Sequence, residues 1–185
     1  IKNVHSQIYH FLGDAFAGLE NYERAISNYS KALKYKKREE ILLIKLGVLH
    51  QKNGKDELAV NCYQRALKFK PDSAFIHNNI GTALLSLGFN LKAKSSFENA
   101  LNYNSKNPQA NKNLAIALNA VGEFDKAILY FKKTIKYKKT DCEAYYGLAI
   151  ALLRMKEIEE GILYFRETMK LDPSHFRAGL ALSWA

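Results

Sequence analysis

The chain has little of several features that define other classes of protein. It contains two cysteines, three prolines and one tryptophan in 185 residues. The cysteines, Cys62 and Cys142, do not have the spacing of metal ligands, which predicts reduced structural thiols and favours a reducing compartment, the cytoplasm. No apolar run approaches the ~18 residues of a membrane span. We therefore expect neither a disulfide framework nor a membrane-spanning helix in this stretch of chain.

The sequence also lacks the motifs of common catalytic sites. None of the five histidines belongs to a His-Glu-x-x-His pattern, and there is no glycine-rich phosphate loop or serine nucleophile elbow. The carboxylates stand mostly singly near expected helix starts, where they complement the helix dipole. We predict no enzymatic activity, no catalytic residue, no cofactor and no metal site.

What the sequence does contain is repetition at a period of 34 residues. Gly13, Gly47 and Gly81 are followed at the same step by Ala115 and Ala149. Four further positions repeat: an aliphatic residue (Leu12, Leu46, Ile80, Leu114, Leu148, Leu182), a small residue (Ala25, Ala59, Ala93, Ala127, Gly161), an aromatic residue (Tyr29, Tyr63, Phe97, Phe131, Phe165) and a second small residue (Ala32, Ala66, Ala100, Thr134, Thr168). Such self-similarity predicts a repeat array rather than one globular core.

Each repeat is predicted to hold two helices, which we call helix A and helix B. In the third repeat they span about 74–87 and 91–104, with Gly88 in the turn. A glycine inside a helix costs roughly 1 kcal/mol, so Gly81 within helix A indicates a close approach of two helices. Asp72 or Ser73 is predicted to cap the helix that follows Pro71, and Ser174 the helix that follows Pro173.

This pattern resembles the tetratricopeptide repeat family, most clearly through Leu46-Gly47, Ala59, Tyr63, Ala66 and Pro71. The resemblance implies an all-α, right-handed superhelical solenoid of helix-turn-helix repeats whose helices A line a concave groove. We predict one solenoid domain over residues 1–185, with repeats at 6–39, 40–73, 74–107, 108–141 and 142–175, and a partial sixth repeat or capping helix at 176–185.

The helical period predicts which residues face this groove. If Ile80, Gly81 and Leu84 pack on helix B, the opposite stripe of each helix A is free for a ligand. Asn79 and Asn113 lie one period apart, and their amides match a peptide backbone; the alternative is two solvated surface asparagines. The predicted peptide-binding residues are Lys45, Lys52, Asn78, Asn79, Thr82, Lys112, Asn113, Ile116, Asn119, Tyr146, Ile150 and Arg154.

These residues predict a non-enzymatic protein–protein interaction scaffold that binds a peptide segment or partner helix. The lysines suit acidic residues of the partner, and Ile116 and Tyr146 suit apolar anchors. The net charge of +10 leaves a basic nucleic-acid binder as an alternative. Its basic runs, at 34–39, 68–70 and 136–139, equally suit the dipoles at the ends of helices B.

Another alternative is a targeting or regulatory domain of a larger enzyme. The chain begins with Ile1 and stops inside an apparent helix, which reads as part of a longer protein. Leu180, Leu182 and Trp184 have no following helix to cover them. We therefore predict that the 176–185 end self-associates or packs back on the chain.

Overall fold

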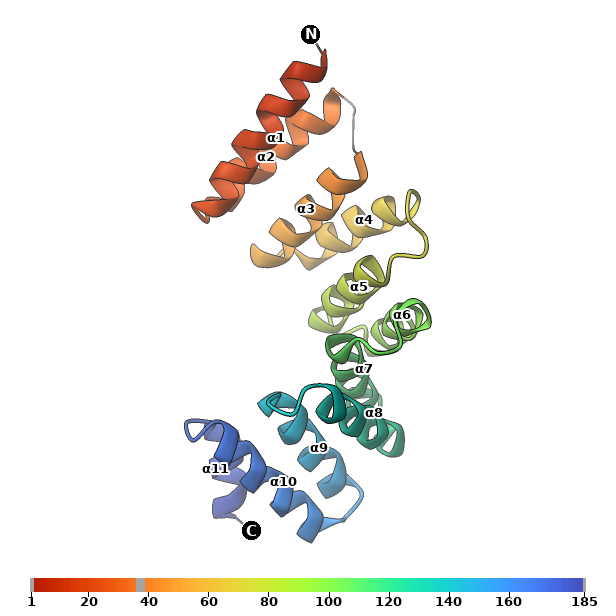
Figure 1. The fold of residues 1–185 in the computed structure, drawn as a ribbon, viewed down its shortest axis with the longest axis vertical. Coiled ribbons are helices and arrows are strands. Elements are labelled where there is room, and N and C mark those ends of the chain that lie inside the picture. The colour runs from red at the N-terminus through yellow and green to blue at the C-terminus, as the bar shows by residue number, and fades with distance from the viewer. Residues whose placement is uncertain (1, 36–38, 185) are drawn as a thin grey trace. The chain divides into compact units, whose positions relative to one another are not determined.

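The computed structural model describes residues 2–35 and 39–184, and all regular elements in these ranges are helices. In chain order they are α1 (Lys2–Gly18), α2 (Tyr22–Lys34), α3 (Glu39–Lys52), α4 (Asp56–Leu67), α5 (Ala74–Ser86), α6 (Asn90–Tyr103), α7 (Pro108–Val121), α8 (Phe124–Tyr137), α9 (Cys142–Arg154), α10 (Ile158–Leu171) and α11 (Phe176–Ser183) (Figure 1). The odd-numbered helices are the predicted helices A, and the even-numbered ones are the predicted helices B. The all-α class predicted from the sequence is confirmed.

The chain divides into two compact units, Ile1–Phe89 and Asn90–Ala185, which we describe separately. The first unit holds α1 to α5 and the second holds α6 to α11. Within each unit, consecutive helices pack against each other, as α1 does on α2 and α7 on α8 (Figure 1). The predicted third repeat, 74–107, is divided between the units, and the single solenoid domain stays a prediction.

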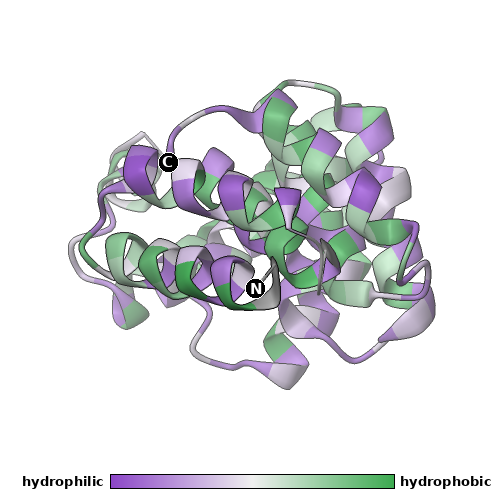
Figure 2. Ribbon diagram, turned by 90° about the horizontal axis from the view of Figure 1, so that it is seen from above, coloured by the Kyte–Doolittle hydropathy of each residue, from purple (hydrophilic) through white to green (hydrophobic). Residues whose placement is uncertain are grey.

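The repeated positions form the cores. The aromatic position is at most 2% exposed in all five repeats, and both small positions beside it are buried. Hydrophobic and hydrophilic residues alternate along individual helices, so each helix offers an apolar side to its neighbours (Figure 2). The helical period of the sequence thus decides which side of each helix is covered.

The glycines of helix A are close-packing positions, as predicted. A Cβ atom on Gly13 would lie 2.4 Å from the ring of Tyr29, and one on Gly47 would lie 2.4 Å from the ring of Tyr63. Real Cβ contacts are never so short, and a fully buried ring has no room to move. Gly81 is buried in α5. The contact between helix and aromatic ring offsets the cost of a glycine inside the helix.

The turn between helix A and helix B has one left-handed residue. Gly54, Gly88 and Gly122 adopt positive φ angles of 67°, 78° and 83°. The equivalent residues of the first and fifth repeats are Glu20 and Lys156, with φ angles of 55° and 66°. A residue with a Cβ atom is strained in this region. The turn geometry is therefore retained where the glycine is absent.

Helix starts follow the predicted caps with one exception. The Ser73 side chain accepts a hydrogen bond from the backbone N–H of Ile76 at the start of α5. The prediction for Ser174 is wrong, because its hydroxyl donates to Asp172 Oδ1 at 2.6 Å instead. His175 caps α11 in its place, with Nδ1 accepting from the backbone N–H of Ala178.

The end of the second unit is only partly covered. Leu182 packs into the apolar cluster around Ala149, Phe165 and Ala178, whereas Leu180 is 44% exposed and Trp184 is 88% exposed. The predicted self-association of this end stays a prediction. Among the described residues, no helix is both long enough and apolar enough to cross a bilayer.

Candidate functional site

The predicted peptide-binding residues divide between the two units. Lys45, Lys52, Asn78, Asn79 and Thr82 belong to α3 and α5 of the first unit. Lys112, Asn113, Ile116, Asn119, Tyr146, Ile150 and Arg154 belong to α7 and α9 of the second. Asn79 and Asn113 therefore lie in different units, and their contact with a peptide backbone stays a prediction.

Lys45 lies in a polar cluster that ties α3 to α1. Its Nζ donates to Asp14 Oδ1 at 2.5 Å and lies 2.9 Å from His10 Nε2. The Tyr29 hydroxyl donates to the same Asp14 oxygen at 2.5 Å. Burial raises the pKa of Asp14, but hydrogen bonds from Lys45 and Tyr29 outweigh burial and hold that pKa below its usual value. The charge of Lys45 is thus already balanced within the first unit.

Asn79 also hydrogen-bonds a buried tyrosine, Tyr63. The Tyr63 hydroxyl donates to Gln51 Oε1 at 2.6 Å, and the Asn79 side chain hydrogen-bonds the same hydroxyl. Burial first, and the nearby acidic groups second, raise the pKa of Tyr63 well above its usual value. A buried hydroxyl without hydrogen-bond partners would be costly, so the bond to Tyr63 is sufficient to explain an amide at position 79 without any ligand.

The same helix-A position contacts the preceding aromatic residue in other repeats. Lys45 Nζ lies 5.6 Å from the centre of the Tyr29 ring. Gly147, two periods after Asn79, is packed so closely that a Cβ atom there would lie 2.3 Å from the Phe131 ring. The ring alone does not fix the residue at this position, because asparagine occurs after Tyr63 and also, as Asn113, after Phe97.

The remaining residues of the first unit are more accessible. Lys52 is exposed, and its Nζ lies 5.7 Å from the centre of the Tyr22 ring. Asn78 and Thr82 are half-buried on α5, where the Thr82 hydroxyl donates to the backbone carbonyl of Asn78 at 3.0 Å. These contacts leave the predicted ligand roles of the three residues untested.

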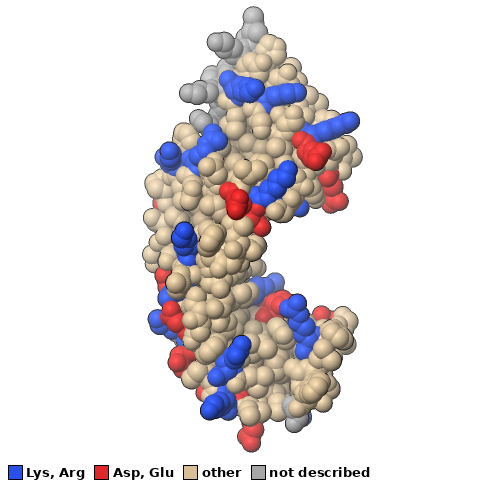
Figure 3. Space-filling model, turned by 180° about the vertical axis from the view of Figure 1, so that it is seen from behind, with Lys and Arg blue, Asp and Glu red and all other residues tan. Residues whose placement is uncertain are grey.

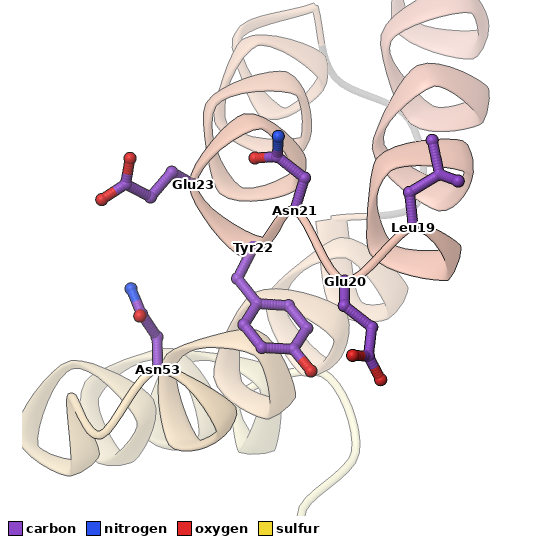
Figure 4. A pocket seen from close by; sticks show the side chains of 6 residues that line it. All are labelled: Leu19, Glu20, Asn21, Tyr22, Glu23 and Asn53. Carbon is purple, nitrogen blue, oxygen red and sulfur yellow. The ribbon is translucent and has the colours of Figure 1, made fainter.

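A hollow of about 460 Å³ lies at the first turn of the chain. Its lining residues are Leu19, Glu20, Asn21, Tyr22, Glu23 and Asn53 (Figure 4). Figure 4 shows that the carboxylates of Glu20 and Glu23 point away from each other. Because they do not converge, the hollow has no pair of carboxylates that could act together on a ligand.

In the second unit, Lys112 forms a buried ion pair. Its Nζ donates to both carboxylate oxygens of Asp141 at 2.9 Å, and the two side chains are 13% and 5% exposed. Asp141 also caps α9 by accepting from the backbone N–H of Ala144. Burial raises the pKa of Asp141, but Lys112 and then Lys138 outweigh burial and hold that pKa below its usual value. A ligand acid would have to compete with this pair.

The two asparagines of α7 also have internal partners. Asn113 is 8% exposed, and its Oδ1 accepts from Gln109 Nε2 at 2.9 Å. Asn119 Nδ2 donates to the backbone carbonyl of Gly147 at 3.2 Å and so links α7 to α9. Asn119 Oδ1 is buried, with no hydrogen-bond partner in the described part of the chain.

The other predicted residues form a more open surface on α7 and α9. Ile116 is 37% exposed, Arg154 is exposed, and Tyr146 and Ile150 are half-buried. We call Ile116, Tyr146, Ile150 and Arg154 the second-unit helix-A face. Tyr146 packs on Phe165 and His175, with ring centres 5.7 Å and 4.8 Å away. This face combines apolar surface with one cation.

A hollow of about 240 Å³ adjoins this face, at the start of α11. Its lining residues are Glu143, Tyr146, His175, Phe176 and Arg177. His175 Nε2 lies 3.5 Å from Glu143 Oε1, and because Nδ1 accepts the capping bond, Nε2 carries the proton in the neutral ring. The sequence prediction missed the α11 residues, although Arg177 follows Glu143 by one period.

On the face shown in Figure 3, Lys and Arg groups are separated by neutral surface and interspersed with Asp and Glu. Two of the predicted basic runs contain paired lysines, since Lys70 pairs with Glu40 at 3.0 Å and Lys138 with Asp141 at 3.3 Å. Lys36, Lys37 and Arg38 of the remaining run lie outside the described residues. The described acidic, histidine and cysteine side chains include no group of three that could hold a metal ion.

A comparison with known protein families matches the tetratricopeptide repeat over residues 5–171. Three solved structures show the same fold. A MamA protein is 24% identical to this chain, with a TM-score of 0.84, and the match covers 94% of both chains. MamA from Desulfovibrio magneticus RS-1 is 17% identical, with a TM-score of 0.86, and the match covers 92% of this chain and 97% of that one. YrrB, described as a tetratricopeptide repeat protein with an unusual peptide-binding site, is 18% identical with a TM-score of 0.81, covering 94% of this chain and 89% of that one. No curated protein matches by sequence.

Proposed function

The chain belongs to the tetratricopeptide repeat family, and on that premise we propose that it is a non-enzymatic scaffold that binds a peptide segment or a partner helix along its helices A. The observation that carries this proposal is the hollow beside Tyr146, which Phe176 and Arg177 of α11 also line. The peptide-binding site described for YrrB gives a precedent within the same fold.

The peptide is anchored by apolar side chains on the second-unit helix-A face. A hollow of about 240 Å³ has room for one apolar side chain. The Tyr146 ring is fixed by Phe165 and His175, so it offers a surface that loses little freedom when a ligand binds. Ile116 and Ile150 occupy equivalent positions of α7 and α9 and extend the apolar contact.

The acidic residues of the peptide are drawn to Arg154 and Arg177. Both side chains are exposed, whereas Lys45 and Lys112 already hold Asp14 and Asp141. An exposed guanidinium can form paired hydrogen bonds with a carboxylate at little desolvation cost. Lys112 then contributes by tying α7 to the start of α9, on which the face is built, and Lys45 ties α3 to α1 in the first unit.

In the first unit, polar side chains of helices A suit contacts to a peptide backbone. Asn78, Thr82 and Lys52 are accessible enough to reach a ligand. Asn79 bonds the Tyr63 hydroxyl with part of its amide and keeps further hydrogen-bonding capacity. Asn119 acts on the second-unit helix-A face by linking α7 to Gly147 of α9, and Asn113 hydrogen-bonds Gln109 on its own helix.

A selection from a displayed peptide library tests this proposal. We expect the wild-type chain to enrich sequences with acidic and apolar residues, and the double variant Ile116→Glu, Arg154→Glu to lose them. The matched control is Leu129→Glu, Lys136→Glu, which makes the same changes at exposed positions of α8. Enrichment that both double variants keep, or no enrichment at all, would count against a site on helices A.

The nucleic-acid alternative has a separate test. Electrostatic binding to phosphates weakens steeply with salt and does not depend on apolar side chains. Suppose that the chain retained RNA or DNA at low salt, and that Lys136→Glu alone weakened this binding whereas Ile116→Glu alone did not. The basic ends of helices B would then be the functional surface. The dispersal of charge and the ion pairs of Lys70 and Lys138 favour the peptide.

A further inference from the structure

The residue that precedes the left-handed position of each turn is apolar in four of the five repeats. These residues are Leu19, Leu87, Val121 and Met155. In the second repeat the same position holds Asn53, and the left-handed residue that follows it is Gly54, with a φ angle of 67°. Asn53 is the only asparagine of the chain that precedes a glycine. The second turn therefore carries a reactive pair of residues that the other turns lack.

An asparagine that precedes a glycine can lose its side-chain amide without an enzyme. The backbone nitrogen of the glycine gives its proton to water and forms a bond to the side-chain carbonyl carbon of the asparagine. The carbon–nitrogen bond of the amide then breaks, and its nitrogen takes up a proton and leaves as ammonia. Water opens the resulting cyclic imide at either of its carbonyl carbons, which gives aspartate or isoaspartate. Glycine favours the attack because it has no Cβ atom to hinder it.

The structure leaves the Asn53 amide open to this reaction. Asn53 is half-buried, and its side chain makes no hydrogen bond or ion pair within residues 2–35 and 39–184. It lines the hollow of about 460 Å³ at the first turn, and Figure 4 shows the amide extending away from the ribbon that carries it. Gly54 is exposed, and a Cβ atom there would meet nothing within 4 Å, so solvent surrounds this side of the turn.

One contact opposes the reaction. The Gly54 N–H donates to the backbone carbonyl of Gln51 at 3.0 Å, and its nitrogen can attack only when this bond opens. The bond lies at the end of α3, which stops at Lys52, and helix ends open more readily than helix centres. Lys52 and Lys55 are both exposed beside the turn, and their charges stabilise a deprotonated backbone nitrogen. Local opening and neighbouring cations therefore favour the attack.

We propose that Asn53 is a site of spontaneous deamidation, which converts an uncharged turn residue into a carboxylate. The new charge lies at the C-terminal end of α3, where a carboxylate is unfavourable to the helix dipole. It also lines a hollow that already contains the carboxylates of Glu20 and Glu23. Isoaspartate lengthens the backbone inside the turn that the Lys55 N–H closes by donating to the His50 carbonyl at 2.8 Å. Deamidation should therefore loosen the end of α3, and the inference does not depend on the proposed peptide site.

Peptide mapping of the whole folded chain by mass spectrometry tests this proposal. The chain is incubated at mildly alkaline pH, and the conversion of each asparagine is followed with time. We expect conversion at Asn53 to be severalfold faster than at Asn104, an exposed asparagine that precedes Ser105. Equal conversion at the two positions, or none at Asn53, would overturn the proposal. A synthetic peptide of residues 49–58 gives the rate in an unfolded chain. Conversion in this peptide but not in the folded chain would mean that the turn protects Asn53, which also overturns the proposal.

Two variants assign the reaction to this pair of residues. Asn53→Gln keeps an amide but requires a larger and less favourable ring, so it should abolish conversion at this position. Gly54→Ala places a methyl group beside the attacking nitrogen and should slow conversion severalfold, although alanine strains a turn with a positive φ. The matched control, Asn104→Gln, should leave conversion at Asn53 unchanged. A gain of mass in Asn53→Gln at the rate of the wild type would place the reaction elsewhere in the chain.

The effect on the turn has its own measurement. The deamidated chain carries an additional negative charge, so ion exchange separates it from the intact chain. The backbone amides of residues 50–57 should exchange with solvent severalfold faster in the deamidated chain, whereas those of α8 should not change. Equal exchange in the two forms would contradict the loosening of α3.

Discussion

The two units use one repeat pattern but bury their polar groups differently. In the first unit the aromatic positions hold Tyr29 and Tyr63, whose hydroxyls are bonded to Asp14 and Gln51. In the second unit they hold phenylalanine, and the buried polar contacts include the Lys112–Asp141 ion pair. A hydroxyl at the aromatic position therefore requires a polar side chain on the neighbouring helix A as its hydrogen-bond partner. A polar residue on helix A is not by itself evidence of a ligand.

The largest effect that this comparison predicts is at the buried ion pair. Lys112→Ala should lower the free energy of unfolding by about 3 kcal/mol, because Asp141 would stay buried without its main partner. Lys132→Ala removes the exposed pair with Glu160 and should cost no more than about 1 kcal/mol. Urea unfolding of both variants gives the difference. Equal losses would contradict the structural role of Lys112.

Exchanging the aromatic residues tests the comparison directly. Phe131→Tyr should cost about 2 kcal/mol, because its new hydroxyl would point at the backbone of Gly147. Tyr63→Phe should cost about 1 kcal/mol, because Gln51 and Asn79 lose a hydrogen-bond partner. Thermal unfolding of the two variants measures both changes. A Phe131→Tyr variant as stable as the wild type would show that the two units accept either ring.

Acid should lower the free energy of unfolding of both units, because each unit contains a carboxyl group whose pKa is held below its usual value. The pKa values of Asp14 and Asp141 are held below their usual value of 3.8, so each carboxylate stabilises the fold above this pH. The contribution is lost as the pH falls below 3.8 and through the lower pKa of the folded state. Denaturant unfolding between pH 6 and pH 2 measures this loss. Asp141→Asn should show a shallower decline than the wild type, and an unchanged decline would contradict the assignment.

The smallest effect is expected at the strained turns. Glu20→Gly and Lys156→Gly should each raise the free energy of unfolding by about 0.5 kcal/mol, since glycine adopts a positive φ without strain but has more freedom in the unfolded chain. Gly122→Ala, at the equivalent turn, should be destabilising. A loss of stability in both glycine variants would mean that these side chains make contacts that outweigh the strain.

The fold could be predicted from the sequence because its causes are local and repeated. A small residue that packs against an aromatic ring recurs at one spacing, so the sequence alone predicts that Gly47 packs against Tyr63. The site was harder to predict. The period gives the side of the helix on which Asn79 and Lys112 lie, but not that Tyr63 and Asp141 are their partners. Asp141 lies 29 residues after Lys112, at the N-cap of α9, and only the packed structure shows the ion pair.

Two signals in the sequence could have improved the site prediction. The change from tyrosine to phenylalanine at the aromatic position predicts where helix A needs a polar partner for a hydroxyl. The stripe that holds Glu143 continues one period later at Arg177, which lines the hollow beside Tyr146. Both signals appear only when equivalent positions of different repeats are compared, so the sequence of a single helix does not show them.

The central claim is that a peptide with acidic and apolar residues binds the second-unit helix-A face. The most direct measurement is calorimetric titration of a selected peptide into the wild type and into Arg154→Glu. We predict that Arg154→Glu lowers the affinity by about fivefold, and that replacing the acidic residue of the peptide by lysine restores it. An affinity unchanged by Arg154→Glu, or not restored by the exchanged charge, would contradict the proposed site.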